Sequence, residues 1–109
     1  MKRYGAVIGL DAAQIAEYTK VHAEVWPDVL KQIKNSNITN YSIFLRQPEN
    51  LLFAYYEYTG QDHDADMAAM AADPVTQKWW DLCMPMQRPL DTRKDGEWWA
   101  PAHEVFHLD

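Results

Sequence analysis

Hydrophobic and polar positions follow two different periods along the chain, and these periods predict strands and helices. The run from Arg3 to Leu10 is strand-like, and Asp11 followed three residues later by Gln14 is a capping-box pattern that begins a helix. In that helix the apolar and aromatic positions recur every three or four residues, so they share one face. They are Ile15, Tyr18, His22, Val25, Val29 and Ile33. Because proline removes a backbone donor, we expect a kink or a restart at Trp26 and Pro27.

The remainder of the chain predicts a hairpin, a broken helical region and a last strand. Tyr41 to Leu45 and Leu51 to Tyr58 are rich in aromatic and aliphatic residues, and a turn-prone segment separates them. A second helical region begins near Asp62 and is broken by the cap and proline of Asp73-Pro74. A loop rich in proline and charge then leads to His103 to Leu108, where side-chain alternation predicts the closing strand.

The predicted order, β-α-β-β-α-β, is typical of one α+β architecture. It is the ferredoxin-like split βαβ sandwich, a four-stranded antiparallel sheet with its helices on one face, here as a single domain over residues 1–109. Both faces of the strand Leu51 to Tyr58 are apolar, so both should be covered. We therefore expect a homodimer in which two sheets pack face to face, a dimeric α+β barrel.

Composition and charge exclude several classes of partner. The chain has 109 residues, of which 48% are hydrophobic and 24% charged, which predicts a folded protein. Its formal net charge of −6 argues against a nucleic-acid partner. No stretch approaches the roughly 18 apolar residues of a membrane span, so we expect a soluble protein without a membrane partner. Cys83 is the single cysteine, which favours a reducing, cytoplasmic location.

The first group with catalytic potential is a ladder on the first predicted helix. Tyr18, His22 and Trp26 stand at positions i, i+4 and i+8, so on a continuous helix they lie one above another. His22 is the member that can take up or release a proton at neutral pH, which suits general acid or base catalysis. The spacing is equally that of a core histidine packed between two aromatic residues.

The second group is the pair Trp79-Trp80. Adjacent residues point about 100° apart around a helix axis, so the two indoles cannot enter the same core. One of them can line a pocket, where an aromatic face suits the C–H face of a sugar ring. The alternative is that one indole is core and the other lies in a dimer interface.

The sequence offers no support for a metal or a cofactor. His103-Glu104-Val105-Phe106-His107 matches the H-E-x-x-H zinc pattern, but on a strand the two histidines are about 13 Å apart and cannot share one metal. The chain has no glycine-rich phosphate loop, and Cys83 has no nearby partner that would make it a nucleophile.

Several segments together make the chain resemble the L-rhamnose mutarotase family, over nearly its whole length. They are Tyr18 to Pro27 (YTKVHAEVWP), Asn40-Tyr41, Asn50 to Ala54, Trp79-Trp80 with Met84-Pro85, and Glu104 to Leu108. The resemblance implies dimers of ferredoxin-like subunits that interconvert the α and β anomers of L-rhamnose without a cofactor. It implies His22 as the proton donor. It implies that Tyr18, Tyr41, Trp79 and Trp80 bind the sugar.

Some assignments stay open at the level of sequence. The general base is one, with Glu57, Tyr55 and water as candidates, and the role of the loop from Pro89 to Pro101 is another. A mutarotase for another 6-deoxy sugar, such as L-fucose, is an alternative, because choosing between such sugars depends on placed hydrogen bonds. Two further alternatives are a small dimeric ferredoxin-like monooxygenase and a non-catalytic sugar-binding dimer.

Overall fold

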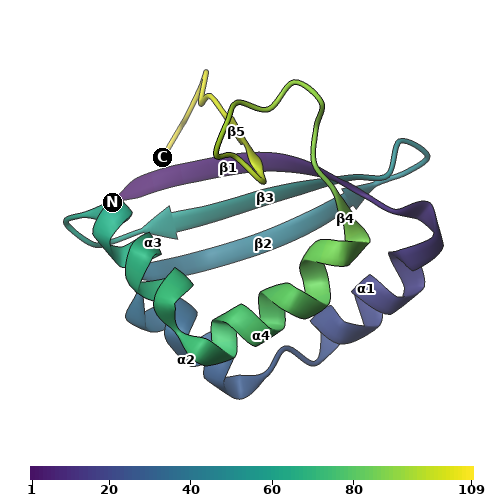
Figure 1. Cartoon of the computed structure of the whole chain (residues 1–109). Helices are drawn as coiled ribbons and strands as arrows, with labels where there is room; N and C mark the ends of the chain where they lie inside the picture. Colours follow the sequence, from purple (N-terminus) through teal and green to yellow (C-terminus); the bar gives the residue numbers. More distant parts are fainter.

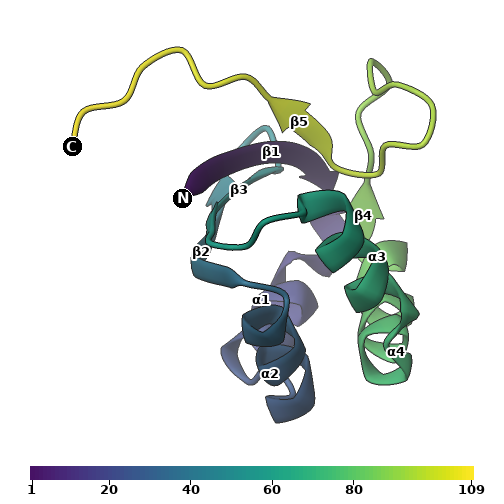
Figure 2. The same ribbon diagram turned by 90° about the vertical axis from the view of Figure 1, so that its left-hand side faces the viewer.

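The computed structural model describes all residues from 1 to 109, which form a layer of helices against a curled sheet (Figures 1 and 2). The strands are β1 (Lys2–Leu10), β2 (Ile38–Arg46), β3 (Leu51–Tyr58), β4 (Gln87–Arg88) and β5 (Ala100–Ala102). The α-helices are α1 (Ile15–Ala23), α2 (Pro27–Asn35), α3 (His63–Ala72) and α4 (Pro74–Cys83). Two short 3-10 turns, η1 (Ala12–Gln14) and η2 (Met84–Met86), precede α1 and follow α4.

The sheet has the strand order β2-β3-β1-β4, and each neighbouring pair is antiparallel. This is the order of the split βαβ arrangement, so the predicted α+β, ferredoxin-like class is confirmed. The strand β5 pairs with Gly5 to Val7 of β1, along the same edge that β4 occupies at Gly9 and Leu10. Figure 2 shows the curled sheet with all the helices on one side of it.

The helix boundaries follow the sequence signals. The side chain of Asp11 accepts a hydrogen bond from the Ala13 amide at 3.0 Å, but the turn that it caps is 3-10 rather than α-helical. The predicted interruption is confirmed, since α1 ends at Ala23 and Pro27 is the first residue of α2. Asp73 caps α4 by accepting hydrogen bonds from both the amide and the hydroxyl of Thr76.

The second strand is longer than the sequence predicts. It begins at Ile38, and an irregularity between Thr39 and Ser42 separates two stretches of regular pairing with β3. Asn40 lies within this bulge with φ of 48°, in the left-handed region that asparagine tolerates. The bulge shifts the pairing, and Tyr41 then lies beside Tyr56 of β3, with ring centroids 5.6 Å apart.

The predicted closing strand from His103 to Leu108 is wrong. Those residues form no strand, and the edge positions beside β1 are held by Gln87–Arg88 and by Ala100–Ala102. Alternation of side chains is not sufficient for a strand, because a strand also needs a neighbour to accept and donate its backbone hydrogen bonds. Pro101 is tolerated in β5 because β5 is an edge strand.

The core lies between the helices and the inner face of the sheet, which is the face turned toward them. Its buried residues come from every layer: Ile8, Leu10, Tyr18, Val29, Leu52, Trp79, Cys83 and Met86. The outer face of the sheet carries the cross-strand pair Phe44 and Phe53, which are 64% and 42% exposed. No helix of the structure has the length and apolar character that crossing a membrane requires.

Candidate functional site

The predicted ladder of Tyr18, His22 and Trp26 is present in part, because Trp26 lies outside the helix that carries the other two. Tyr18 and His22 lie on α1 with their rings stacked, at 4.1 Å between centroids and 23° between planes. Trp26 lies in the break before α2, so it does not continue the α1 stripe. Its indole instead meets the edge of Trp79 at 5.2 Å, and Trp79 meets His22 at the same centroid distance. The four rings form one aromatic group between α1 and α4.

The two nitrogens of His22 are not equivalent. Nδ1 lies 2.9 Å from the backbone oxygen of Tyr18, and because a carbonyl only accepts, Nδ1 carries the hydrogen. In the neutral imidazole the lone pair is therefore on Nε2. Burial lowers the pKa of His22 below its usual 6.5, against a smaller opposing effect of the hydrogen bond to Tyr18. The neutral form with a basic Nε2 is thus the main form at neutral pH.

Tyr18 is held at its hydroxyl by a buried amide. Nε2 of Gln87 donates to the Tyr18 oxygen at 3.1 Å, and the indole nitrogen of Trp98 donates to Oε1 of Gln87 at 2.7 Å. Burial raises the pKa of Tyr18 to about 12, although the Gln87 hydrogen bond acts in the opposite direction. The phenol is therefore protonated at neutral pH and can donate its hydrogen.

Tyr41 approaches the same region from β2. The residue is 41% exposed, yet burial is the largest cause that raises its pKa to about 12, followed by the nearby Tyr18 and Cys83. Its hydroxyl end therefore points inward while part of the ring meets solvent. Beyond it, the hydroxyl of Tyr56 and Nε2 of His63 share a hydrogen bond of 2.7 Å, and Tyr4 stacks on His63 at 4.1 Å.

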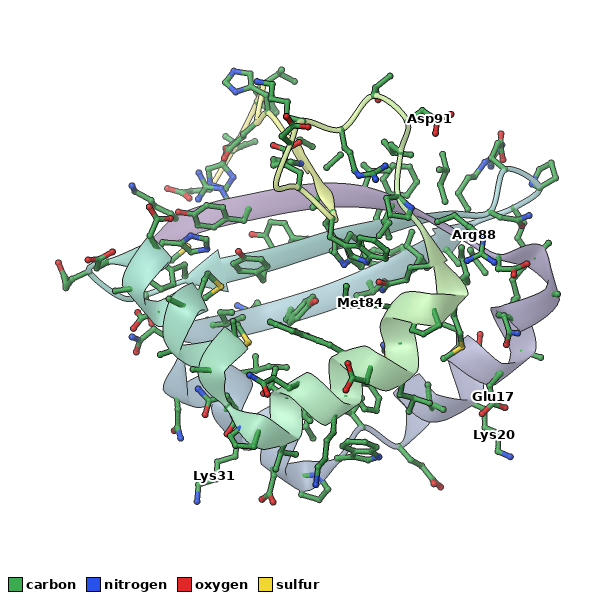
Figure 3. All side chains as sticks on the ribbon, viewed as in Figure 1. Glu17, Lys20, Lys31, Met84, Arg88 and Asp91 are labelled. Carbon is green, nitrogen blue, oxygen red and sulfur yellow. The ribbon has the colours of Figure 1, made fainter.

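The two predicted tryptophans have different surroundings, as expected for neighbours on a helix. Trp79 is buried against His22 and Trp26, whereas Trp80 is half-buried and packs at the margin of the core. The structure therefore brings Tyr18, His22, Trp79 and the hydroxyl of Tyr41 to one region. Trp80 is adjacent to that region through α4. Glu17, Lys20 and Lys31 extend from α1 and α2 toward solvent (Figure 3). None of the chain's ion pairs includes a residue of this region.

Several other candidates lie elsewhere. The hydroxyl of Tyr55 donates to Glu57 at 2.7 Å, and Glu57 is opposite Arg3 in the β1–β3 register, so both side chains occupy the outer face. Neither reaches His22, and both are thereby removed as candidates for the base. Burial raises the pKa of Cys83 to about 11, which keeps it a thiol at neutral pH. His107 bonds Asp109 in the C-terminal tail, far along the chain from the ladder.

Two open hollows, of about 490 and 360 Å³, lie at the loop between β4 and β5. The first is lined mostly by charged side chains of that loop, and in the second Arg93, Lys94 and Glu97 lie beside small aliphatic residues with no aromatic ring. A sugar site needs apolar faces beside a few convergent polar groups. The aromatic group around His22 meets that requirement, and the loop hollows do not.

The sequence does not reveal the contacts that Trp26, Trp98 and Gln87 make in this region. Trp26 is visible as part of the ladder, but its contact with Trp79 depends on how α2 packs on α4. The Trp98-Trp99 pair marks the late loop as unusual. Nothing in the sequence marks Gln87, because a two-residue strand leaves no periodic pattern.

Known proteins match this chain over its whole length. The family model described as L-rhamnose mutarotase matches residues 3–108. The L-rhamnose mutarotase of Lactiplantibacillus plantarum is 36% identical over 113 residues, and that of Oceanobacillus iheyensis is 33% identical over 109 residues. In both cases the alignment covers 100% of each chain.

Two solved structures share the fold. The crystal structure of an L-rhamnose mutarotase from Formosa agariphila superposes with a TM-score of 0.79 at 23% identity, covering 100% of both chains. Tetracenomycin F2 cyclase from Streptomyces glaucescens has a TM-score of 0.75 at 14% identity and covers 100% of this chain and 98% of its own. At these identities the structures establish the fold, and the full-length sequence match establishes the family. The chain belongs to the L-rhamnose mutarotase family.

Proposed function

We propose that this chain interconverts the α and β anomers of L-rhamnose by opening and reclosing the pyranose ring. Membership of the family, over residues 3–108, makes the protein a carbohydrate isomerase of the aldose mutarotase type. The observation that carries the proposal within the structure is His22, whose Nδ1 is committed to a carbonyl and whose Nε2 is left for a substrate. L-fucose is the alternative sugar.

The reaction requires only proton transfers and therefore no cofactor. In ring opening, the anomeric hydroxyl loses its proton, the bond between C1 and the ring oxygen breaks, and the ring oxygen gains a proton. Reclosure on the other face of the aldehyde reverses these transfers. Neutral His22 accepts the anomeric proton through Nε2, and the resulting imidazolium returns it on reclosure. The proton-donor role that the resemblance implies for His22 is this returning half.

The phenols supply the complementary group. Tyr18 and Tyr41 both have pKa values of about 12, so both are proton donors at neutral pH. Each can hold a sugar hydroxyl or donate to the ring oxygen as the bond to C1 breaks. The indoles of Trp79 and Trp80 offer apolar faces for the C–H side and the methyl group of a 6-deoxy sugar.

We also propose that the active form is a homodimer of single-domain chains in the cytoplasm. The outer face carries the apolar row Val7, Phe53 and Phe44, which are register neighbours across three strands, with Val7 half-buried and the two phenylalanines exposed. Beside it, the tail exposes Val105, Phe106 and Leu108, each at 79% or more, and Figure 2 shows the tail extending away from its own body. In a dimer with two-fold symmetry, the same apolar row of each copy faces that of the other. A second copy of this chain can therefore cover the exposed row.

The activity is tested by NMR exchange between the anomeric signals of L-rhamnose at equilibrium. Faster exchange with the protein than in buffer, for L-rhamnose and not for D-glucose, is the expected result. Faster exchange for L-fucose alone keeps the mechanism and changes the sugar. Parental protein that accelerates no sugar contradicts the proposal and favours the monooxygenase or sugar-binding alternatives.

A further inference from the structure

Gln87 is a buried polar residue whose amide is bonded at both ends. It is 6% exposed, and both of its side-chain hydrogen bonds are made to other residues of the chain. Its Nε2 donates to the hydroxyl oxygen of Tyr18, and its Oε1 accepts from the indole nitrogen of Trp98. The amide thus connects the loop between β4 and β5 to the candidate site.

The indole of Trp98 determines which way this amide faces. An indole N–H can only donate, so the atom 2.7 Å from it must be the amide oxygen. The amide nitrogen then faces Tyr18, whose oxygen must accept. Within the chain the Tyr18 hydroxyl donates to no other group, so its own hydrogen is left for a ligand.

The position of Gln87 is set by the sheet. Gln87 pairs with Leu10 in the two-residue contact of β4 with β1, and this pairing turns its side chain toward the core. The contact is close because of Gly9, where an added Cβ would lie 2.5 Å from the backbone oxygen of Arg88. The Arg88 guanidinium also pairs with Asp11, which joins β4 to the start of η1.

We propose that Gln87, oriented by the Trp98 indole, is a positioning residue that commits the Tyr18 hydroxyl to donate toward the sugar. This role rests on the proposed function, and it makes Tyr18 the source of the proton that the ring oxygen gains. As the bond from C1 to the ring oxygen breaks, the Tyr18 hydrogen moves to that oxygen while His22 takes the anomeric proton. On reclosure the tyrosinate recovers its hydrogen and the imidazolium returns the other, so the protein ends unchanged.

The variant Gln87→Glu reverses the hydrogen bond without changing the side chain's length. A carboxylate accepts from both Trp98 and Tyr18, so it captures the hydrogen that the sugar needs. We expect kcat for L-rhamnose exchange at pH 8 to fall on the order of tenfold to a hundredfold, with a smaller change in KM. Acidification protonates the buried glutamate, which can then donate to Tyr18, so the deficit relative to the parent narrows as pH falls.

Trp98→Phe removes the group that orients the amide, and Trp99→Phe is its matched control in the same loop. We expect the first to lower kcat severalfold and the second to leave it at the parental value. In a Tyr18→Phe background, Gln87→Glu should cause no further loss, because its effect passes through the missing hydroxyl. Circular dichroism and thermal melting establish that each variant is folded.

Three results overturn the inference: parental kcat in folded Gln87→Glu, a loss of the same size with Tyr18 replaced, or equal effects of the two tryptophan substitutions. If Gln87→Glu does not fold, the tryptophan pair decides the question. Failure of the inference is distinguishable from failure of the proposed function. In the first case the parental protein still accelerates exchange, and in the second it does not.

Discussion

At the scale of single residues, the properties of His22 come from its own helix and from what covers it. The hydrogen bond from Nδ1 to the Tyr18 carbonyl is local, four residues back along α1, and needs no tertiary contact. The lowered pKa has a different origin, since it follows from burial beside Tyr18 and Trp79. The helix geometry therefore determines which nitrogen of His22 carries the hydrogen, and tertiary packing keeps the ring neutral at neutral pH.

Replacing the imidazole should remove most of the activity. We expect His22→Ala to lower the L-rhamnose exchange rate about a hundredfold or more, the scale of a lost general acid or base. His103→Ala, at an exposed position without a hydrogen bond, is the matched control and should keep the parental rate. Rates are measured by NMR exchange after subtraction of the buffer rate. A folded His22→Ala with near-parental exchange excludes His22 from the mechanism.

The rate should depend on pH in one direction. Protonation occupies Nε2, so the catalysed exchange falls as pH drops through the pKa of His22, which lies below 6.5, and is level above neutral pH. Because the unfolded imidazole binds a proton at higher pH than the folded one, stability also decreases over the same acid range. An NMR titration of the His22 ring protons with a midpoint above 6.5 contradicts this prediction.

At the scale of elements, the helix α4 matters because it carries both tryptophans. Its start is defined by Asp73, whose Oδ2 accepts from the Thr76 amide at 2.9 Å and from the Thr76 hydroxyl at 2.8 Å. Thr76 is buried, so its hydroxyl has no water to replace that partner. The sequence Asp73-Pro74 predicted this boundary, since a cap followed by proline is a local signal.

Removing the cap should destabilise the protein measurably. Asp73→Ala is expected to lower the free energy of unfolding by about 1 to 2 kcal/mol, because the helix start loses its acceptor and a buried hydroxyl loses its partner. Asp73→Asn keeps an acceptor oxygen and should lose only a part of that. Urea denaturation followed by circular dichroism measures both. Equal stability of Asp73→Ala and the parent contradicts the role given to the cap.

At the scale of the whole molecule, the outer face of the sheet is a surface where large apolar side chains are exposed to solvent. Phe44 and Phe53 oppose each other in the β2–β3 register and are largely exposed, on a face that no helix of the chain covers. Arg3 holds Glu104 at 3.1 Å, which brings the start of the apolar tail to the same side. The face and the tail together form the surface at which we place the second copy.

A charge in the centre of that face should separate the copies. We expect the parent to have twice the chain mass of 12.7 kDa by light scattering at micromolar concentration, and Phe53→Glu to have the chain mass alone. The side chain is exposed in the single chain, so folding should be kept. Leu30→Glu, at an exposed apolar position on α2, is the control and should stay at the parental mass. A monomeric parent contradicts the dimer.

Most of the architecture follows from periodicity and punctuation in the sequence. The first strand, the hairpin, the break before Pro27 and the start of α4 each depend on residues within a few positions of one another, so local patterns predicted them. The closing strand was wrong because pairing depends on which edge is free, and residues distant in sequence had taken the edge of β1.

The same division applies to the candidate site. The sequence by itself determined the family, the ladder of Tyr18 and His22, and the adjacent indoles of Trp79 and Trp80. Only the tertiary structure decided that Tyr55 and Glu57 face away, and that Gln87 and Trp98 meet Tyr18. The physical reason is that a helix turn is specified by neighbours along the chain. A hydrogen bond across 69 residues exists only once the sheet has aligned β4 with β1.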